Sequence, residues 1–300
     1  MTEKWKNLYR FFLSIVRWDE LLIGSLLLLL GQAFNKFYGF RFDASIFLNL
    51  VIWFFFINTS SSFLDVVLSG DAEKTLPIDS TSTKPSGNLR LIFIQVIWVF
   101  SILMAAMSFI PLIRIQDSVG FNHLSIMILS LFYFINFIFF LEPAQRMLGG
   151  MREFAYALKN AFLLPALSFS IQQDFLKSAL ILAAFPVFLQ LILLKASENL
   201  EYYLEGKKTP GDSLVARLGS PSTLKMITVL AIISGLTLFL KTGISGFWYK
   251  VIILVLECLT ASLYFRSIVR QTPNWEYAYR LTRLLSIAIP ALIIVTVWPF

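Results

Sequence analysis

The sequence predicts an all-α integral membrane protein, a bundle of nine transmembrane helices around a central cavity. Three observations lead to this prediction. Of the 300 residues, 57% are hydrophobic and only 14% are charged, whereas a soluble domain usually carries about 25% charged residues. The apolar residues gather in nine stretches, each near the roughly 20 residues that cross a bilayer core. Lys and Arg are unequally divided between the two sides that these stretches define.

The apolar stretches follow one another along the whole chain. The first is longer than the apolar region of a signal peptide and is followed by further stretches, so we expect it to be a transmembrane helix. The fifth is the weakest because it contains Lys159 and Asn160. The nine stretches cover residues 20–38, 45–64, 91–113, 122–141, 155–171, 175–195, 225–241, 247–265 and 284–299.

The placement of basic residues predicts the orientation. With nine spans, the N-terminus and alternate loops share one side, and 19 of the 25 Lys and Arg residues fall on that side. Basic residues accumulate in cytoplasmic loops. We therefore expect a multi-pass protein of the cell membrane, with a cytoplasmic N-terminus and the C-terminus on the opposite side. The formal net charge of +7 then reflects topology, and nucleic acid is not an expected partner.

The composition also limits the chemistry. Cys258 is the single cysteine and His123 the single histidine, which excludes a disulfide within the chain, a thiolate zinc cluster and a multi-histidine metal site. A bound metal would need oxygen ligands, as Mg²⁺ prefers.

Two polar loops, 58–90 and 195–225, interrupt the apolar pattern. Each follows an even-numbered span, so both lie on the predicted cytoplasmic side. Four spans separate them, which suggests one membrane domain, 1–300, made of two related halves at about 1–120 and 121–300. Internal repeats of this kind are common in membrane proteins that enclose a central site.

The first loop begins with polar residues at helical spacing. If the second span continues, Asn58, Ser62 and Asp65 lie on one helix face, at offsets of four and seven. Asp71 and Lys84 follow further along the chain. The carboxylates of such a row could hold Mg²⁺, and the lysine could neutralise a phosphate that the metal also binds.

The second loop carries a comparable row of acids. Glu198, Glu201 and Glu205 are spaced by three and four residues, which again places them on one helix face. Three basic residues follow that could bind diphosphate: Lys207, Lys208 and Arg217. A metal and cations around a diphosphate would suit the ionisation of an allylic diphosphate, since they stabilise the leaving group as charge develops.

Each of these residues also has an ordinary structural interpretation. Loop carboxylates are often simply solvated, and the basic residues of the second loop could be topology anchors. Glu257 is the one acid well inside a span. An ionisable residue at that depth is a functional candidate by default, with a hydrogen bond to a neighbouring helix as the alternative.

The two loops resemble the motifs of the UbiA superfamily of intramembrane prenyltransferases. The first motif of that family corresponds to the stretch from Asn58 through Asp65 and Asp71 to Lys84-Pro85-Ser86-Gly87. The second corresponds to Glu198 and Tyr202, then Gly206-Lys207-Lys208-Thr209 and Leu214–Gly219. The chain departs from the family where Thr59 and Tyr202 replace acids, and Glu201 and Glu205 could take over as ligands.

The resemblance implies a divergent membrane prenyltransferase, which transfers an alkyl group other than methyl. It would move a polyprenyl group from an isoprenyl diphosphate to a lipophilic or aromatic acceptor. The family pattern assigns one Mg²⁺ to Asn58, Asp65 and Asp71, and the other to Glu198, Glu201 and Glu205. It assigns diphosphate binding to Lys84 and Lys207, and shielding of the allylic cation to Tyr202 or Tyr203, by cation–π attraction.

Two alternatives stay open from the sequence. The missing acids would suit a UbiA-like protein that binds an isoprenoid or quinone without turnover. Glu257 and a polar cavity would suit a secondary transporter, although the spans lack the paired broken helices typical of such proteins.

Overall fold

The structure is a computed structural model, and it describes residues 15–68, 87–138, 140–141, 148–204, 206, 213–239, 247–270 and 275–298. These residues form helices and short connections, with no strand among them. The chain divides into two compact units. The first comprises Met1–Leu22 and Leu48–Ser118, and the second comprises Ile23–Phe47 and Val119–Phe300.

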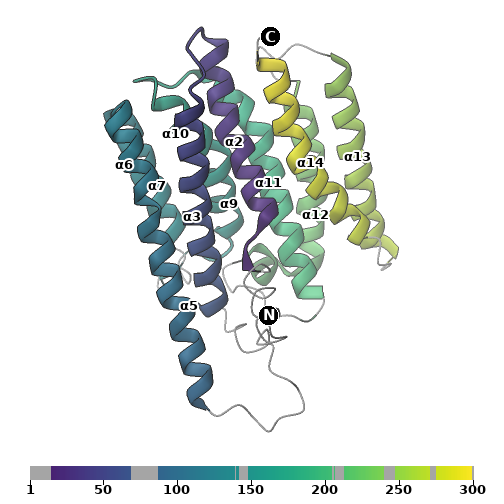
Figure 1. Cartoon of the computed structure of the whole chain (residues 1–300). Coiled ribbons are helices and arrows are strands. Elements are labelled where there is room, and N and C mark those ends of the chain that lie inside the picture. Colours follow the sequence, from purple (N-terminus) through teal and green to yellow (C-terminus); the bar gives the residue numbers. More distant parts are fainter. Residues whose placement is uncertain are drawn as a thin grey trace, which may run out of the picture. The chain divides into compact units, whose positions relative to one another are not determined.

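The helices agree with the predicted spans (Figure 1). Within the described ranges, seven are long and apolar enough to cross a membrane. They are α2 (Trp18–Phe37), α3 (Ala44–Leu68), α5 (Gly87–Met107) continued by α6 (Phe109–Ser118), α11 (Ser178–Leu204), α12 (Leu214–Thr237), α13 (Phe247–Arg270) and α14 (Trp275–Val297). The shorter apolar helix α7 (His123–Ile138) matches the fourth predicted span.

Two predicted spans are less regular than expected. The third is interrupted at Ser108, between α5 and α6, because Pro111 has no backbone N–H to continue the hydrogen-bond ladder. The fifth is divided into α9 (Arg152–Ala157), the π-helix η1 (Leu158–Leu163) and α10 (Leu164–Ser170). This segment completes nine helical segments among the described residues, which confirms the predicted all-α membrane fold.

In the first unit, small polar residues join α3 to α5. Ser60 Oγ donates to the Ser101 carbonyl at 2.9 Å, and Ser101 Oγ donates to the Ser60 carbonyl at 2.9 Å. Small hydroxyl residues allow helices in a membrane to approach closely. One turn away, Phe63 packs edge-on against Phe100, with ring centroids 5.1 Å apart.

In the second unit, α2 and α10 approach at a glycine. A Cβ on Gly31 would lie 2.3 Å from the carbonyl oxygen of Pro165, so only glycine fits there. Gln32 Nε2 donates to the Ser168 carbonyl at 2.8 Å, and Ser168 Oγ donates to the Leu28 carbonyl at 2.7 Å. Buried amides and hydroxyls thus join the two helices.

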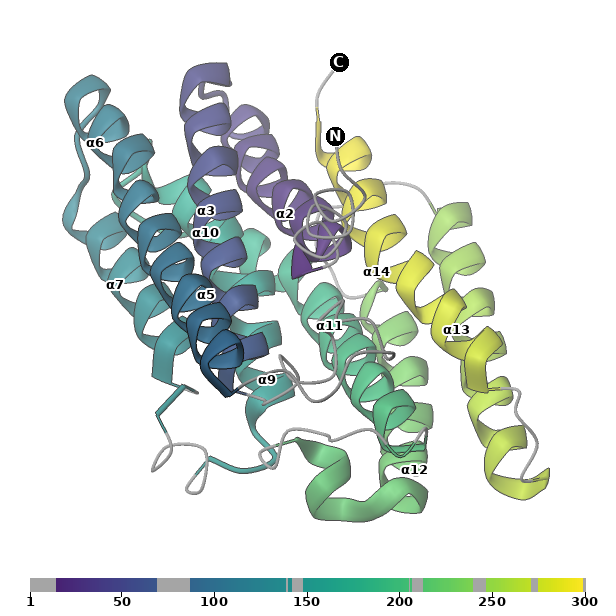
Figure 2. The same ribbon diagram turned by 60° about the horizontal axis from the view of Figure 1, so that its bottom comes forward.

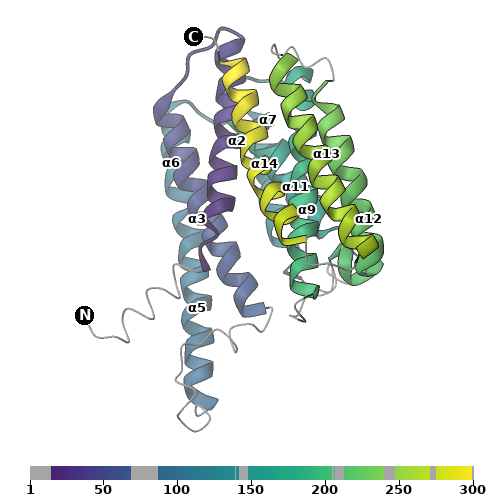
Figure 3. The same ribbon diagram turned by 90° about the vertical axis from the view of Figure 1, so that its right-hand side faces the viewer.

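The last four helices of the second unit form a four-helix group (Figures 2 and 3). Helix α11 packs against α12 and α14, and α13 packs against the same two helices. Helices α11 and α13 therefore lie diagonally across the group. One hydrophobic core cluster of the group consists of Leu193, Ala196, Leu200, Leu214, Val215, Leu224, Ile227, Ala231, Ala261, Tyr264 and Ala278.

The stretch Leu214–Gly219, predicted as the tail of the second motif, is the start of α12. Ser213 caps this helix, because its side chain accepts a hydrogen bond from the backbone N–H of Ala216. Gly219 then breaks the helix with φ of 74°, a conformation that favours glycine, and Pro221 follows. The backbone conformation at this break therefore accounts for the glycine at the end of the motif.

Candidate functional site

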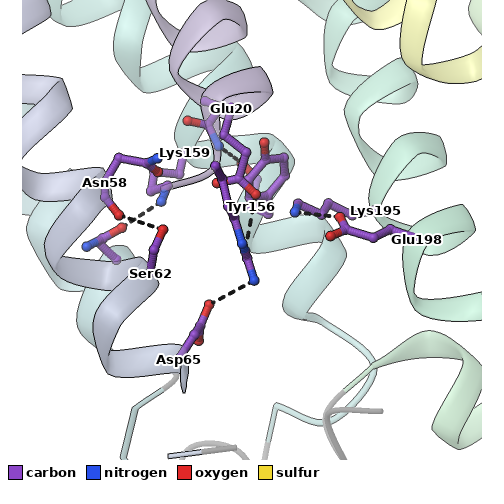
Figure 4. Close-up of polar contacts among 11 residues, drawn as sticks. Glu20, Asn58, Ser62, Asp65, Tyr156, Lys159, Lys195 and Glu198 are labelled. Atoms are coloured by element: carbon purple, nitrogen blue, oxygen red, sulfur yellow. Dashed lines mark hydrogen bonds and ion pairs between the residues drawn. The ribbon is translucent and has the colours of Figure 1, made fainter. Parts of the chain in front are cut away.

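In the first unit, α3 continues through the predicted row of polar residues. Asn58, Ser62 and Asp65 lie on this one helix, as the spacing predicts. Ser62 Oγ donates to the Asn58 carbonyl at 3.0 Å (Figure 4). The Asn58 side chain is buried, and its Nδ2 has no hydrogen-bond partner among the residues that the structure describes.

Arg17 links two carboxylates of the first unit. Its Nη2 lies 3.5 Å from Asp65 Oδ2, and its Nη1 lies 3.2 Å from Glu20 Oε1. Glu20 is buried, whereas Arg17 and Asp65 are partly exposed. Asp65 therefore carries an ion pair that a bound Mg²⁺ would have to replace or share.

In the second unit, Lys159 is buried with an amide as its hydrogen-bond partner. Only 8% of the residue is exposed, and Nζ donates to Asn136 Oδ1 at 2.6 Å. The ammonium also lies 5.4 Å from the ring centre of Phe132 and 5.9 Å from that of Tyr156. The lysine stands in the π-helix η1, a local irregularity that often marks functional sites.

A second lysine contacts the same tyrosine. Lys195 Nζ lies 4.6 Å from the ring centre of Tyr156 and 2.7 Å from Glu198 Oε2 (Figure 4). Two cations therefore lie near one aromatic ring. We call Asn136, Tyr156, Lys159, Lys195 and Glu198 the lysine site.

Beside the lysine site, one buried glutamate ties three helices together. Glu153 Oε1 accepts from Asn199 Nδ2 at 2.6 Å and from the backbone N–H of Leu214 at 3.0 Å. The three residues come from α9, α11 and the first turn of α12. Glu153 thereby fixes the start of α12 against the stretch of α11 that carries Glu198.

The structure does not bring all predicted residues of the second loop together. Glu198 is paired with Lys195, whereas Glu201 lies within electrostatic range of the Tyr264 hydroxyl. Tyr202 and Tyr203 are exposed on the end of α11. Arg217 is exposed, and its side chain lies against Gly149.

Five predicted site residues lie outside the described residues: Asp71, Lys84, Glu205, Lys207 and Lys208. Among all the residues that the structure describes, no group of three or more His, Cys, Asp or Glu side chains is arranged to hold a metal ion.

Of the lysine site, the sequence predicts only Glu198 as a site residue. Lys159 and Asn160 stood out only as residues that weakened the fifth span, although a cation inside a span is itself a functional signal. Lys195 was counted as a topology residue. Tyr156 and Glu153 gave no signal, because an aromatic residue and an acid near a span end are common.

The lysine site can hold an anion. Two ammonium groups, one of them buried, offer charge-assisted hydrogen bonds to phosphate oxygens, and aromatic rings lie beside both. Together with the helices, the site defines a multi-pass helical membrane protein with a cationic site inside one of its units.

The fold is that of solved UbiA homologs. The chain is similar to a UbiA homolog from Archaeoglobus fulgidus bound to GPP and Mg²⁺, with a TM-score of 0.60 and 17% identity over 95% of this chain and 99% of that chain. A UbiA homolog from Archaeoglobus fulgidus bound to Cd²⁺ gives a TM-score of 0.60 and 16% identity, over 94% of this chain and 99% of that chain. With DMAPP and Mg²⁺ bound, the values are 0.58 and 15%, over 93% and 99%.

No protein-family model matches the chain, and no curated protein matches it. At these identities the structures establish the UbiA fold, which the two loop motifs had predicted.

Proposed function

We propose that the protein is a membrane prenyltransferase, which transfers a prenyl group from an isoprenyl diphosphate to a lipophilic or aromatic acceptor. The single observation that carries this proposal is the buried Lys159, held by Asn136 beside Tyr156 in a chain with the UbiA fold. A buried ammonium needs a stable anionic or polar partner. The diphosphates of the GPP and DMAPP bound to the similar structures are such partners.

The proposed reaction breaks the bond between the allylic carbon and the diphosphate oxygen, whose electron pair leaves with the diphosphate. A new bond then forms between the allylic carbon and the acceptor, which loses a proton. Lys159 and Lys195 would bind the diphosphate and stabilise its growing negative charge. The face of Tyr156 would lie near the positive allylic fragment, which an aromatic ring attracts.

The described acids suit Mg²⁺ by their chemistry, because the ion prefers carboxylate and amide oxygens and usually keeps substrate phosphates as further ligands. We propose that Asn58 and Asp65 would hold one Mg²⁺ ion in the first unit, and that Glu198 and Glu201 would hold another in the second unit. Asp71 and Glu205 remain proposed ligands, and Lys84, Lys207, Lys208 and Arg217 remain proposed diphosphate ligands. Bound Mg²⁺ would supply positive charge for the leaving diphosphate.

Tyr202 and Tyr203 remain proposed contacts for the prenyl chain or the acceptor. The orientation proposed for the site follows from the basic residues, with the N-terminus and both polar loops on the cytoplasmic side of the cell membrane.

The test is transfer of label from GPP into lipid. Purified protein is incubated with Mg²⁺, GPP labelled in the prenyl chain and a membrane lipid extract that supplies acceptors. We expect an organic-soluble labelled product and release of diphosphate in equal amounts. Product without diphosphate release, or neither one, would contradict transfer.

The Asp65→Asn variant provides the matched control. We expect it to lose at least 100-fold in transfer rate, because the carboxylate charge is removed at unchanged size. Its fold should survive, since Asp65 lies partly exposed and its ion pair with Arg17 contributes little to stability. Full transfer by this variant would remove Asp65 from the mechanism.

A second candidate is a protein that binds an isoprenyl diphosphate without transferring it. The ion pair of Glu198 with Lys195 and the tyrosine at position 202 favour this candidate, because both reduce the acids free for a metal. Binding of GPP that needs no Mg²⁺, with no labelled product, would identify it.

A further inference from the structure

With Glu257 ionised, the interior of the α11–α14 group contains more hydrogen-bond acceptors than donors. Glu257 of α13 and Gln190 of α11 are both completely buried. Neither oxygen of Glu257 has a hydrogen-bond partner among the described residues, and the same holds for Gln190 Oε1. Three buried oxygens therefore accept no hydrogen bond among the described residues. Each unsatisfied polar atom in a membrane interior costs free energy.

The nearby donors are already used. Gln190 Nε2 donates to the Thr282 carbonyl at 3.0 Å, and the Tyr264 hydroxyl donates to Ser197 Oγ at 2.8 Å. The hydroxyls of three further side chains donate to backbone carbonyls of their own helices: Ser197, Thr260 and Thr282. These five residues thus leave no surplus donor for the three oxygens.

The register of the helices places Gln190 and Glu257 at one depth. Tyr264 of α13 contacts Ser197 of α11 across the diagonal of the group. Glu257 lies seven residues before Tyr264, and Gln190 lies seven residues before Ser197. Helices α11 and α13 run in the same direction, opposite to that of α12, which lies between them in the sequence (Figure 3). Two helical turns are the same rise on both helices.

Ser234 of α12 lies at this level between the two helices. Its hydroxyl is near the Glu257 carboxyl and donates to the Pro186 carbonyl of α11 at 3.3 Å. Gly235 brings α12 close to Glu257, because a Cβ there would lie 3.2 Å from the Glu257 Cβ. A rotated Ser234 hydroxyl would supply one donor, still fewer than the three acceptors require.

We propose that Glu257, Gln190 and Ser234 form a binding site for one Na⁺ ion inside the α11–α14 group. All ligands would be oxygens, which hard cations prefer. One carboxylate balances one positive charge, whereas a divalent ion would leave an uncompensated charge in a medium of low dielectric. The site is independent of the proposed transfer reaction, and its ion would join α11, α12 and α13.

The test is the thermal stability of the detergent-purified protein in NaCl and in choline chloride at equal ionic strength. We expect the wild-type protein to gain roughly 4 to 8 °C in saturating Na⁺. The Glu257→Gln variant should gain nothing, because a neutral amide does not balance the ion. The control Glu276→Gln, at an exposed acid of α14, should respond as the wild type does.

Direct binding of ²²Na⁺ to the wild-type protein keeps the proposal testable where Glu257→Gln does not fold. One ion bound per chain, displaced by unlabelled Na⁺ and not by choline, is the expected result. Equal stability in both salts with no bound ²²Na⁺ would overturn the proposal and leave Glu257 as a protonated acid. An equal response of Glu257→Gln and the wild type would overturn it too.

Discussion

Two of the buried ionisable side chains in the second unit, Lys159 and Glu257, differ in their surroundings. At the lysine site, the ammonium of Lys159 has an amide oxygen at 2.6 Å and two aromatic rings around it. In the α11–α14 interior, the carboxyl of Glu257 has no hydrogen-bond partner among the described residues. The first is a cation with neutral partners, which suits an anionic ligand. The second is an acid among unpaired acceptors, which suits a cation.

This difference predicts that replacing the two side chains affects GPP binding differently. Lys159→Met should weaken binding roughly 10- to 100-fold, because a charge-assisted hydrogen bond to phosphate contributes about 1.5–3 kcal/mol. Glu257→Gln should leave the GPP affinity unchanged. The measurement is a GPP titration of each purified variant by thermal shift, in the presence of Mg²⁺.

Lys225→Met, at an exposed lysine of α12, controls for the general loss of positive charge. Equal weakening in Lys159→Met and Lys225→Met would mean that the effect is not local. Weaker GPP binding by Glu257→Gln would mean that both regions contribute to one ligand site, which would contradict the difference drawn between them.

The carboxylate beside the lysine site is predicted to matter for stability. Glu153→Gln keeps the size of the side chain, yet it removes the charge that accepts from Asn199 and from the Leu214 N–H. We expect a loss of about 1–3 kcal/mol in the free energy of unfolding. The midpoint of thermal unfolding should fall by several degrees.

The exposed pair of Glu276 and Arg280 provides the matched comparison for this prediction. Arg280 Nη2 lies 2.6 Å from Glu276 Oε1, but both side chains are largely exposed. Glu276→Gln should therefore change stability by less than about 0.5 kcal/mol. A larger effect in Glu276→Gln than in Glu153→Gln would contradict the importance given to burial.

Apart from the control variants, the smallest expected effect concerns the amide that holds Lys159. Asn136→Leu removes the acceptor at 2.6 Å and leaves the ammonium in place. GPP affinity should fall by a few-fold, about 1 kcal/mol, because the lysine is no longer held in one orientation. In the absence of GPP, the Asn136→Asp variant should be at least as stable to thermal unfolding as the wild type. If Asn136→Leu bound GPP more weakly than Lys159→Met, Asn136 itself would contact the ligand.

The sequence allowed the fold to be predicted because lipid imposes a simple rule. Apolar stretches of about 20 residues must be helical, since backbone groups have no other partners in a membrane. The same rule does not predict the break at Ser108 or the π-helix around Lys159. Those irregularities depend on one proline and on packing between helices, neither of which changes the average hydropathy.

The candidate site was predicted only in part. The spacing of Asn58, Ser62 and Asp65 on α3 was correct, because helical periodicity fixes it. The partners of Glu198 were not predictable by the same means. Lys195 is close to Glu198 in the sequence, but its contact with Tyr156 joins α11 to α9, a tertiary contact that no local pattern encodes.

The most direct test of the account is GPP binding by the wild-type protein, measured as thermal stabilisation with and without Mg²⁺. At about 100 times its dissociation constant, the ligand should add roughly 2.7 kcal/mol to the free energy of unfolding. The account predicts this stabilisation in the presence of Mg²⁺, and its loss when Mg²⁺ is chelated. Absence of stabilisation under both conditions would contradict a diphosphate site in this protein.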